Sequence, residues 1–241
     1  IANLAELITQ LSGAQLVVLT PHANTSGAWL AGAVPHRAAG GVPVDETGFH
    51  TMQQIQQSLR AYFLLHVDLE LDCADARRAI QAMQQAELVV AMTPFIGSAK
   101  SYAHVILPIA SSFETAGTFV NVTGNWQSFQ ASIPPLADSR PAWKVLRVLG
   151  GLFGLNGFDY TTVSEVCEEL GALLEQHTGL IKHTCEPTFV SSHGTSVDIE
   201  YVMRPSIYRV DNLVRRSVPL QTSSLALPCA AYMSNALIKR L

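Results

Sequence analysis

The chain has 241 residues, of which 48% are hydrophobic and only 14% are charged, and its formal net charge is −4. A surface this poor in charge indicates that a partner covers part of it, and no apolar run approaches the roughly 20 residues of a membrane span, which argues against direct membrane insertion. Residues 1–200 carry a net charge of −9 and residues 201–241 one of +5, so the basic end is expected to dock on an acidic surface. Nucleic acid is disfavoured as the partner because the basic end lacks interleaved stacking aromatics.

A helix, a strand and a polar loop are predicted first. The apolar positions Leu4, Leu7, Ile8 and Leu11 recur at helical spacing, and Gly13 is placed to end that helix. Gln15–Leu19 is predicted to be a buried strand, followed by the loop Thr20–Gly27 and a helix from Ala28. The loop residues Asn24, Ser26 and Gly27 are candidates for presenting N–H groups to an anion. Because the loop has no G-x-G-x-x-G or Walker pattern, a plain β–α connection is the favoured alternative.

Strands and helices then alternate. After a surface loop at residues 35–50, the pattern predicts a helix at Met52–Leu59, a strand at Ala61–Val67, a helix carrying Ala76, Ile80 and Met83, and strands at Leu88–Met92 and Val105–Leu107. This order predicts right-handed crossovers and an α/β fold with a mostly parallel, Rossmann-like sheet flanked by helices.

Four carboxylates follow the strand at Ala61–Val67: Asp68, Glu70, Asp72 and Asp75. Such a cluster is able to bind a hard cation or to act in acid–base chemistry. The alternative is structural, with Asp72 as a helix N-cap and Asp75 in the first helical turn, where the helix dipole favours negative charge. We favour the structural interpretation because it accounts for more of the pattern.

The stretch from Tyr102 to Gln127 is the centre of the chain's organisation. A strand ends at Pro108, a polar turn with Glu114 leads to Gly117, and a second extended segment runs from Thr118 to Val122 before the turn at 123–125. This pattern places a loop at the carboxyl edge of an open sheet, where ligands usually bind. The alternative is a strand and hairpin with no ligand. Gly117 is predicted to adopt a positive φ, and Glu114 to be buried and hydrogen-bonded so that it orients the loop.

Two further helices precede a less regular C-terminal extension. Ser139 and Pro141 predict a helix start with a buried face of Trp143, Leu146, Leu149 and Phe153, and Thr162 with Glu165 forms a capping box for a helix that His177 and Gly179 close. We divide the chain at residue 180, with residues 181–241 as the extension. Within the extension we predict a strand at Thr195–Met203, a helical turn at Val210–Arg216, irregular chain at Val218–Pro228 and a helix start at Asn235–Leu241. The arm from about residue 200 to Leu241 is expected to clamp back along the body or to pair with a second copy, held by apolar burial.

No catalytic, cofactor-binding or metal-binding residue is assigned. The cysteines Cys73, Cys167, Cys185 and Cys229 form no C-x-x-C pair. The zinc-capable residues His177, His183, Cys185 and His193 match no standard zinc spacing, and His177 has a sufficient role at a helix C-terminus. Ser111 and Ser112 have no G-x-S-x-G frame.

The stretch YAHVILPIASSFETAGTFVNVTGNWQ, at 102–127, resembles the molybdopterin oxidoreductase superfamily. Further matching segments are Ala61–Leu65, Glu70–Ala74, Ala86–Val90 and Arg140–Arg147, and the resemblance covers roughly residues 15 to 175. Together they are most similar to one branch, the large iron–sulphur subunit of bacterial NADH:quinone oxidoreductase, respiratory complex I.

The resemblance implies a fragment of a peripheral-arm subunit that acts as scaffold without its own redox centre. Iron–sulphur clusters are then expected in an N-terminal part of the parent chain, other subunits of the arm as partners, and a location on the cytoplasmic side of the bacterial inner membrane. Asn125 stands where the pterin enzymes commonly have Arg, which removes a bidentate phosphate fork. The alternatives are part of a pterin-dependent molybdenum or tungsten oxidoreductase such as a formate dehydrogenase, and a small-molecule-binding α/β module near Asn24 and Gly117.

Overall fold

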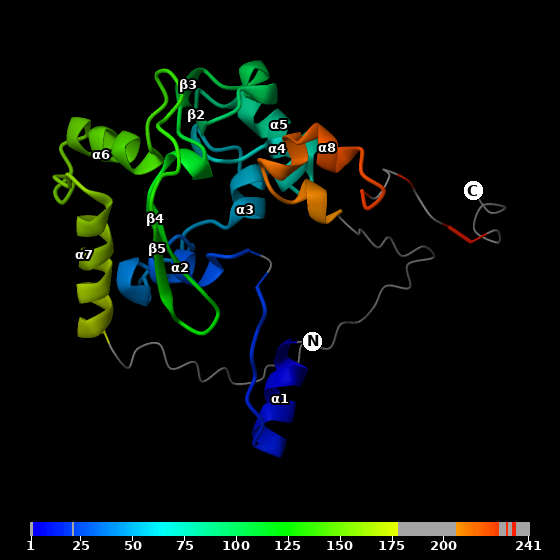
Figure 1. The fold of residues 1–241 in the computed structure, drawn as a ribbon, viewed down its shortest axis with the longest axis vertical. Coiled ribbons are helices and arrows are strands. Elements are labelled where there is room, and N and C mark those ends of the chain that lie inside the picture. Colours follow the sequence, from blue (N-terminus) through cyan, green and yellow to red (C-terminus); the bar gives the residue numbers. More distant parts are fainter. Residues whose placement is uncertain (1, 21, 178–205, 227–229, 231–232, 235–241) are drawn as a thin grey trace.

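The fold is α/β and is built on a small parallel sheet (Figure 1). A computed structural model describes residues 2–20, 22–177, 206–226, 230 and 233–234. The sheet has the order β1-β2-β3, with β1 at Ala61–Leu65, β2 at Leu88–Thr93 and β3 at Val105–Pro108, and both pairings are parallel. The predicted parallel sheet flanked by helices is therefore confirmed.

One face of the sheet packs on α5 (Ala76–Gln85) to form the core. Asp75 caps α5 by accepting from the Arg78 N–H at 3.0 Å, and the helix buries Ala79, Ala82 and Met83 against Val89 and Ala91 of β2. The short helices α3 (Thr51–Gln56) and α4 (Leu69–Asp72) and the 3-10 turn η2 (Gly97–Ser101) contribute Ile55, Leu69 and Ala99 to the same cluster. Both connections between the strands thus add residues to one face.

The opposite sheet face is only partly covered. Val90 and Met92 of the central strand are buried, but Phe63 and Leu65 of β1 and Val105 of β3 are exposed. Parallel sheets usually have both faces covered, so this face has the character of a surface that a neighbouring element occupies.

A separate antiparallel hairpin joins the sheet region to α2 (Thr25–Leu30). Its strands are β4 (Gly117–Val120) and β5 (Trp126–Phe129), and it follows the 3-10 turn η3 (Ser112–Glu114). The Asn24 side chain accepts from the buried Val120 N–H at 2.8 Å, which ties the start of α2 to the hairpin. Phe119 and Phe129 pack edge to face with ring centroids 5.0 Å apart.

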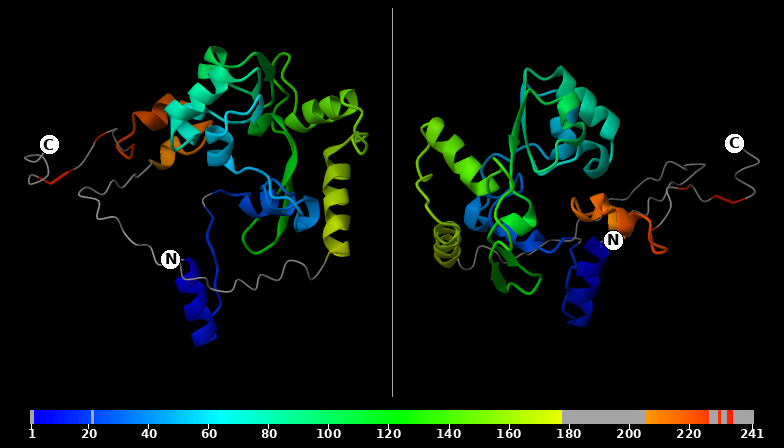
Figure 2. Two further views of the ribbon diagram at one scale, coloured as in Figure 1. Left: turned by 180° about the vertical axis from the view of Figure 1, so that it is seen from behind. Right: turned by 45° about the horizontal axis from the view of Figure 1, so that its top comes forward.

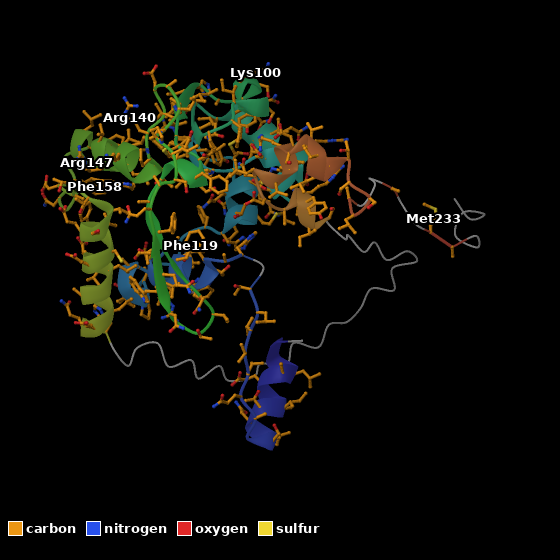
Figure 3. The ribbon with its side chains drawn as sticks, viewed as in Figure 1. Lys100, Phe119, Arg140, Arg147, Phe158 and Met233 are labelled. Atoms are coloured by element: carbon orange, nitrogen blue, oxygen red, sulfur yellow. The ribbon has the colours of Figure 1, made fainter. Side chains whose placement is uncertain are left out.

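The helices α6 (Ala142–Leu152) and α7 (Val163–Gln176) follow the hairpin, and α7 also lies near η1 (Ala39–Gly41). Arg147 donates to the Tyr160 carbonyl at 2.8 Å, and the Phe158 ring packs on Gly150, where a Cβ would overlap it. Figure 3 shows Arg147 and Phe158 beside each other in the region between the two helices. These contacts hold the connection between α6 and α7 against α6.

The C-terminal segment at residues 206–226 lies against the body beside α4 and α5 in both views (Figures 1 and 2). It contains η4 (Ile207–Arg209), η5 (Val214–Arg216) and α8 (Val218–Gln221). The helix α1 (Ala2–Ser12) stands apart from the sheet in the same views. In the part of the chain that the structure describes, no helix has the length and apolar character needed to cross a membrane.

Several local predictions in the first half of the chain are settled. The helix ending before Gly13 is confirmed, because Gly13 has φ +70° and donates to the Thr9 carbonyl. The strand at Gln15–Leu19 is wrong: these residues lie in no strand, and Leu19 is 82% exposed. The N-cap of α5 is Asp75, because Asp72 belongs to the separate turn α4.

Predictions in the second half are partly wrong. Ser139 does not cap α6, since its hydroxyl donates to the Leu136 carbonyl and Pro141 takes the N-cap position. The predicted face of α6 fails at Leu146 and Phe153, which are exposed. Thr162 does cap α7, but the Glu165 carboxylate bonds Thr161 instead of completing the box with Thr162. Of the helical turn predicted at 210–216, only the end is helical, and α8 lies within the region predicted to be irregular. The elements predicted at 195–203 and 235–241 lie outside the described residues.

Candidate functional site at the carboxyl edge of the sheet

A cluster of four charged side chains lies at the carboxyl edge of the sheet, between the ends of β1 and β2. The chain leaves β1 through His66, whose φ of +57° turns it sharply, and then forms α4. Asp68 stands just before α4 and Asp72 is its last residue. The Asp68 N–H donates to the Asp72 carboxylate at 2.7 Å, so α4 holds both acidic side chains together.

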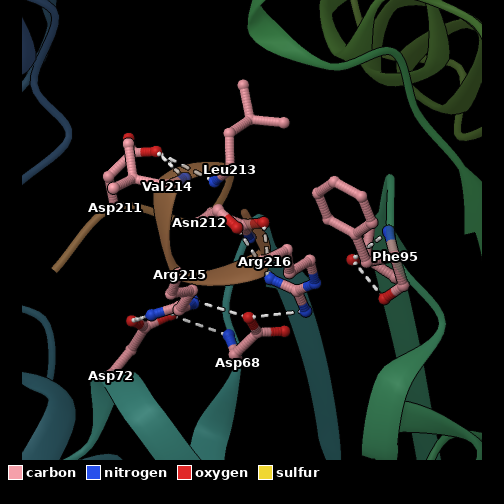
Figure 4. A network of polar contacts seen from close by, with 10 residues as sticks. Asp68, Asp72, Phe95, Asp211, Asn212, Leu213, Val214, Arg215 and Arg216 are labelled. Carbon is pink, nitrogen blue, oxygen red and sulfur yellow. Dashed lines mark hydrogen bonds and ion pairs between the residues drawn. The ribbon is translucent and has the colours of Figure 1, made fainter. Parts of the chain in front are cut away.

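Two consecutive arginines of η5 reach these carboxylates (Figure 4). Arg215 contacts Asp68 at 2.6 Å and Asp72 at 2.8 Å, and Arg216 contacts the same Asp68 oxygen at 2.9 Å. The Arg215 side chain is 4% exposed and the Asp68 side chain 11%, whereas Asp72 remains partly open to water. The four formal charges cancel, which is the condition under which charged groups are tolerated when buried.

An aromatic ring completes the site on the side of β2. The Arg216 guanidinium lies over the half-buried Phe95 ring, 4.2 Å from its centroid. Thr93, at the end of β2, fixes Phe95: its hydroxyl donates to the Phe95 carbonyl at 2.9 Å and accepts from the Phe95 N–H at 3.1 Å. Planar guanidinium groups stack well on aromatic faces. The arginine pair therefore contacts carboxylates after β1 and an aromatic ring after β2.

The electrostatics keep Asp72 charged. Burial opposes its ionisation, but the hydrogen bond to Arg215, the Asp68 N–H and the charges of both arginines together lower the pKa of the Asp72 carboxyl below its ordinary value. The hydrogen bond to Asp72 raises the pKa of Arg215. A carboxylate held ionised in this way is a poor general acid, so the arrangement favours binding over proton transfer.

The turn that carries the arginines is held by its own side chains. Asp211 accepts from the N–H groups of Leu213 and Val214, both at 2.9 Å, and Arg216 donates to the carbonyl and side chain of Asn212. Two buried donors of this turn, Asn212 Nδ2 and Arg215 Nε, have no hydrogen-bond partner.

The other predicted candidates do not join this site. The Asn24 side-chain oxygen lies over Gly27, filling the space of a Cβ there, and is already bonded to Val120. Glu114 accepts from Ser111 N and Leu136 N, which confirms the predicted hydrogen bonding to the loop, but its side chain is half-buried and not buried as predicted. The predicted positive φ at Gly117 is wrong; its constraint is the Phe129 ring, 2.9 Å from the place that a Cβ would take.

Asn125 and His177 are also engaged locally. Asn125 is exposed in the β4–β5 turn and donates to the Thr123 hydroxyl at 3.2 Å. The His177 ring lies 2.6 Å from the Leu173 carbonyl at the end of α7, and the other three zinc candidates lie outside the described residues. Among the described residues no group of three or more His, Cys, Asp or Glu is placed to hold a metal ion.

Sequence reasoning identified Asp68 and Asp72 but missed their arginine partners. Arg215 and Asp72 are 143 positions apart, and no local pattern connects them. The signal that was present is the opposite charge of the two parts of the chain, to which the adjacent Arg215–Arg216 pair contributes. That signal predicted docking but not the residues responsible.

Comparisons with known proteins place this architecture in a family. The chain matches the molybdopterin oxidoreductase family over residues 1–152. It is 32% identical over 94 residues to the NADPH-Fe(3+) oxidoreductase subunit alpha of Geobacter sulfurreducens (39% of this chain, 11% of the relative), and 28% identical over 99 residues to a formate dehydrogenase-like protein of Staphylococcus haemolyticus (41% and 10%).

The chain thus spans about a tenth of the length of these relatives. Among solved structures, acetylene hydratase from Pelobacter acetylenicus is similar with a TM-score of 0.42 and 17% identity, covering 58% of this chain and 21% of that one. The family match extends over more than half of the chain, from α1 through the parallel sheet and the hairpin to α6. The chain belongs to the molybdopterin oxidoreductase family.

Proposed function

We propose that this chain is a scaffold portion of a pterin-dependent oxidoreductase subunit of the formate dehydrogenase class. Membership of the molybdopterin oxidoreductase family supports an oxidoreductase, and the Geobacter and Staphylococcus relatives carry names of redox enzymes. Because the chain spans about a tenth of those relatives, the proposal assigns substrate turnover and electron transfer to other parts of the protein.

In the part of the chain that the structure describes, the polar groups that could contact a pterin are bonded to other residues of the chain. At the loop before α2, Asn24 is engaged by Val120, and at the hairpin turn Asn125 is engaged by Thr123. At the carboxyl edge, the guanidinium groups that would suit a phosphate are neutralised by Asp68 and Asp72. The scaffold assignment rests on one observation: Arg215 and Arg216 of the chain itself occupy the carboxyl edge of the sheet and pair with its carboxylates.

A second candidate is the large iron–sulphur subunit in the peripheral arm of a proton-pumping NADH:quinone oxidoreductase. The order of motifs from Tyr102 to Gln127 favours it, as does Asn125 at the position where the pterin enzymes commonly have Arg. In that case the iron–sulphur clusters lie elsewhere in the parent chain, the partners are other subunits of the arm, and the location is the cytoplasmic side of the bacterial inner membrane.

The two candidates are separated by analysing the protein purified from the cells that express it. Molybdenum or tungsten by elemental mass spectrometry, together with a fluorescent pterin oxidation product and formate-dependent dye reduction, is the result expected for the first. Electron transfer from NADH to quinone without metal-bound pterin would overturn the first candidate and support the second. Absence of both activities from intact, fully assembled protein would contradict both.

A further inference from the structure

The carboxyl edge of the sheet recognises guanidinium groups in particular. Asp72 meets Arg215 with two parallel contacts, Nη1 to Oδ1 at 2.8 Å and Nη2 to Oδ2 at 3.3 Å. One Asp68 oxygen lies between both arginines, and Phe95 lies beneath the plane of Arg216. Paired contacts and ring stacking require the planar fork of arginine, and a lysine ammonium cannot reproduce them.

The acceptor half of the site is held by bonds within the body. The Asp68 N–H fixes the Asp72 carboxylate, and Thr93 fixes Phe95 through two hydrogen bonds. Neither interaction involves residues 206–226. The two carboxylates and the ring are therefore preorganised to receive the arginines, which lowers the cost of binding.

The donor half, residues 206–226, contacts the receptor residues through its two arginines. Of the segment's large apolar residues, Ile207, Val210, Val218 and Leu225 are exposed, whereas Leu213, Val214 and Leu220 are half-buried. The segment's own structure comes from internal bonds, such as Gln221 Nε2 to the carbonyls of Tyr208 and Val214. Buried ion pairs and stacking on Phe95 join residues 206–226 to the body, and the apolar burial expected for the arm from about residue 200 to Leu241 stays a prediction.

We propose that Asp68, Asp72 and Phe95 form a receptor site for two consecutive arginines, and that residues 206–226 are its occupant within the chain. A site built from body residues accepts an Arg-Arg peptide from outside whenever the internal segment is displaced. The opposite net charges of the two parts of the chain favour the encounter.

The test uses the full chain with the double substitution Arg215→Ala and Arg216→Ala, which empties the site. A fluorescent synthetic peptide of residues 206–226 is added, and its binding is followed by anisotropy. In the unaltered chain the internal segment competes at a high effective concentration, so we expect the double variant to bind the peptide at least about tenfold more tightly. The same peptide with both arginines replaced by lysine is expected to bind at least about tenfold more weakly, because the fork and the stack are lost.

Two controls make the result specific. Asp68→Asn added to the double variant is expected to abolish peptide binding, whereas Arg60→Ala, which removes an exposed ion pair with Glu87, is expected to leave it unchanged. Circular dichroism establishes that each variant is folded. Equal binding of the arginine and lysine peptides, or no binding to a folded double variant, would overturn the proposal.

A second measurement does not depend on the folding of the double variant. An excess of unlabelled peptide is added to the unaltered chain, and amide hydrogen exchange is measured at residues 206–226. Displacement by the arginine peptide is expected to speed exchange there while β2 stays protected. Unchanged exchange at saturating peptide would contradict a receptor site that exchanges its occupant.

Discussion

Arg215→Met isolates the contribution of the buried guanidinium. The substitution keeps an apolar stem of similar reach and removes the charge from a side chain that is only 4% exposed. Removing one partner of a buried ion pair costs about 3–5 kcal/mol, because the remaining charge stays buried without compensation. Here Asp68 keeps Arg216 at 2.9 Å and the partly open Asp72 regains water, so we expect the lower end, about 3 kcal/mol.

The expected loss concerns the opening of residues 206–226 from the body. About 3 kcal/mol corresponds to roughly a hundredfold change in the opening equilibrium. Native-state hydrogen exchange measures this opening equilibrium at the amides of Arg216 and Gln221, which donate to the Leu213 and Ser217 carbonyls within the segment. Exchange at these two amides is expected to rise about a hundredfold, up to the unprotected rate, with β2 unaffected.

Arg60→Met is the matched control. Arg60 also meets a carboxylate, Glu87, through two contacts of 2.9 and 2.8 Å, but the side chains are 85% and 64% exposed. Exposed pairs contribute little, so exchange in residues 206–226 should stay as in the unaltered chain. If Arg215→Met and Arg60→Met gave the same exchange, burial would not be the source of the strength and the reasoning would fail.

Further predictions concern pH and three positions, Gly117 in the hairpin, Gly171 in α7 and Asn24 before α2. The pKa of Asp72 is lowered on folding, so its ion pair contributes its full stabilisation above the ordinary Asp pKa of about 3.9. This contribution is lost as the pH falls through the lower pKa of the folded state. Amide exchange in residues 206–226 should therefore stay slow at pH 5 and rise only below about pH 4. Gly117→Val is expected to destabilise the protein by about 1–3 kcal/mol in urea unfolding, because its Cβ meets the Phe129 ring. Gly171→Ala in α7, which has open space around it, should stabilise the protein by about 0.5–1 kcal/mol. Equal effects of the two substitutions would refute crowding by Phe129 as the cause. Asn24→Ala leaves the buried Val120 N–H unpaired and should cost about 1–3 kcal/mol, while Asn24→Asp keeps an acceptor and should cost less; matching losses would exclude that hydrogen bond as the cause.

The parallel sheet was predictable because each of its strands is a short apolar run bounded by turn residues. Ala61–Leu65 and Leu88–Thr93 were found in this way. Gln15–Leu19 is a similar apolar run, yet it pairs with no strand among the described residues and is exposed. Composition reports the capacity to form a strand, whereas a strand also needs a neighbour to complete its hydrogen bonds, and local sequence does not say whether one is available.

The site was predictable only in part, for a related reason. The acidic cluster after β1 could be recognised because its members are close in sequence. The N-cap of α5 was predicted at Asp72, three residues before the actual cap Asp75, because α4 forms a separate turn before α5. The arginine partners come from far along the chain, and charge counting indicated the sign of the interaction without its geometry. Gly117 was assigned a backbone role because the ring that crowds it, Phe129, belongs to the other strand of the hairpin.

The exposed strand β1 has a consequence for handling the chain. It forms one side of the described parallel sheet, and both Phe63 and Leu65 are open to water. An unpaired strand edge with apolar side chains is a template for adding strands from other molecules, so concentrated solutions are expected to aggregate through this edge. A lysine on the exposed side acts against such growth, and Phe63→Lys is therefore the substitution of choice for keeping the chain dispersed at the concentrations that hydrogen exchange requires.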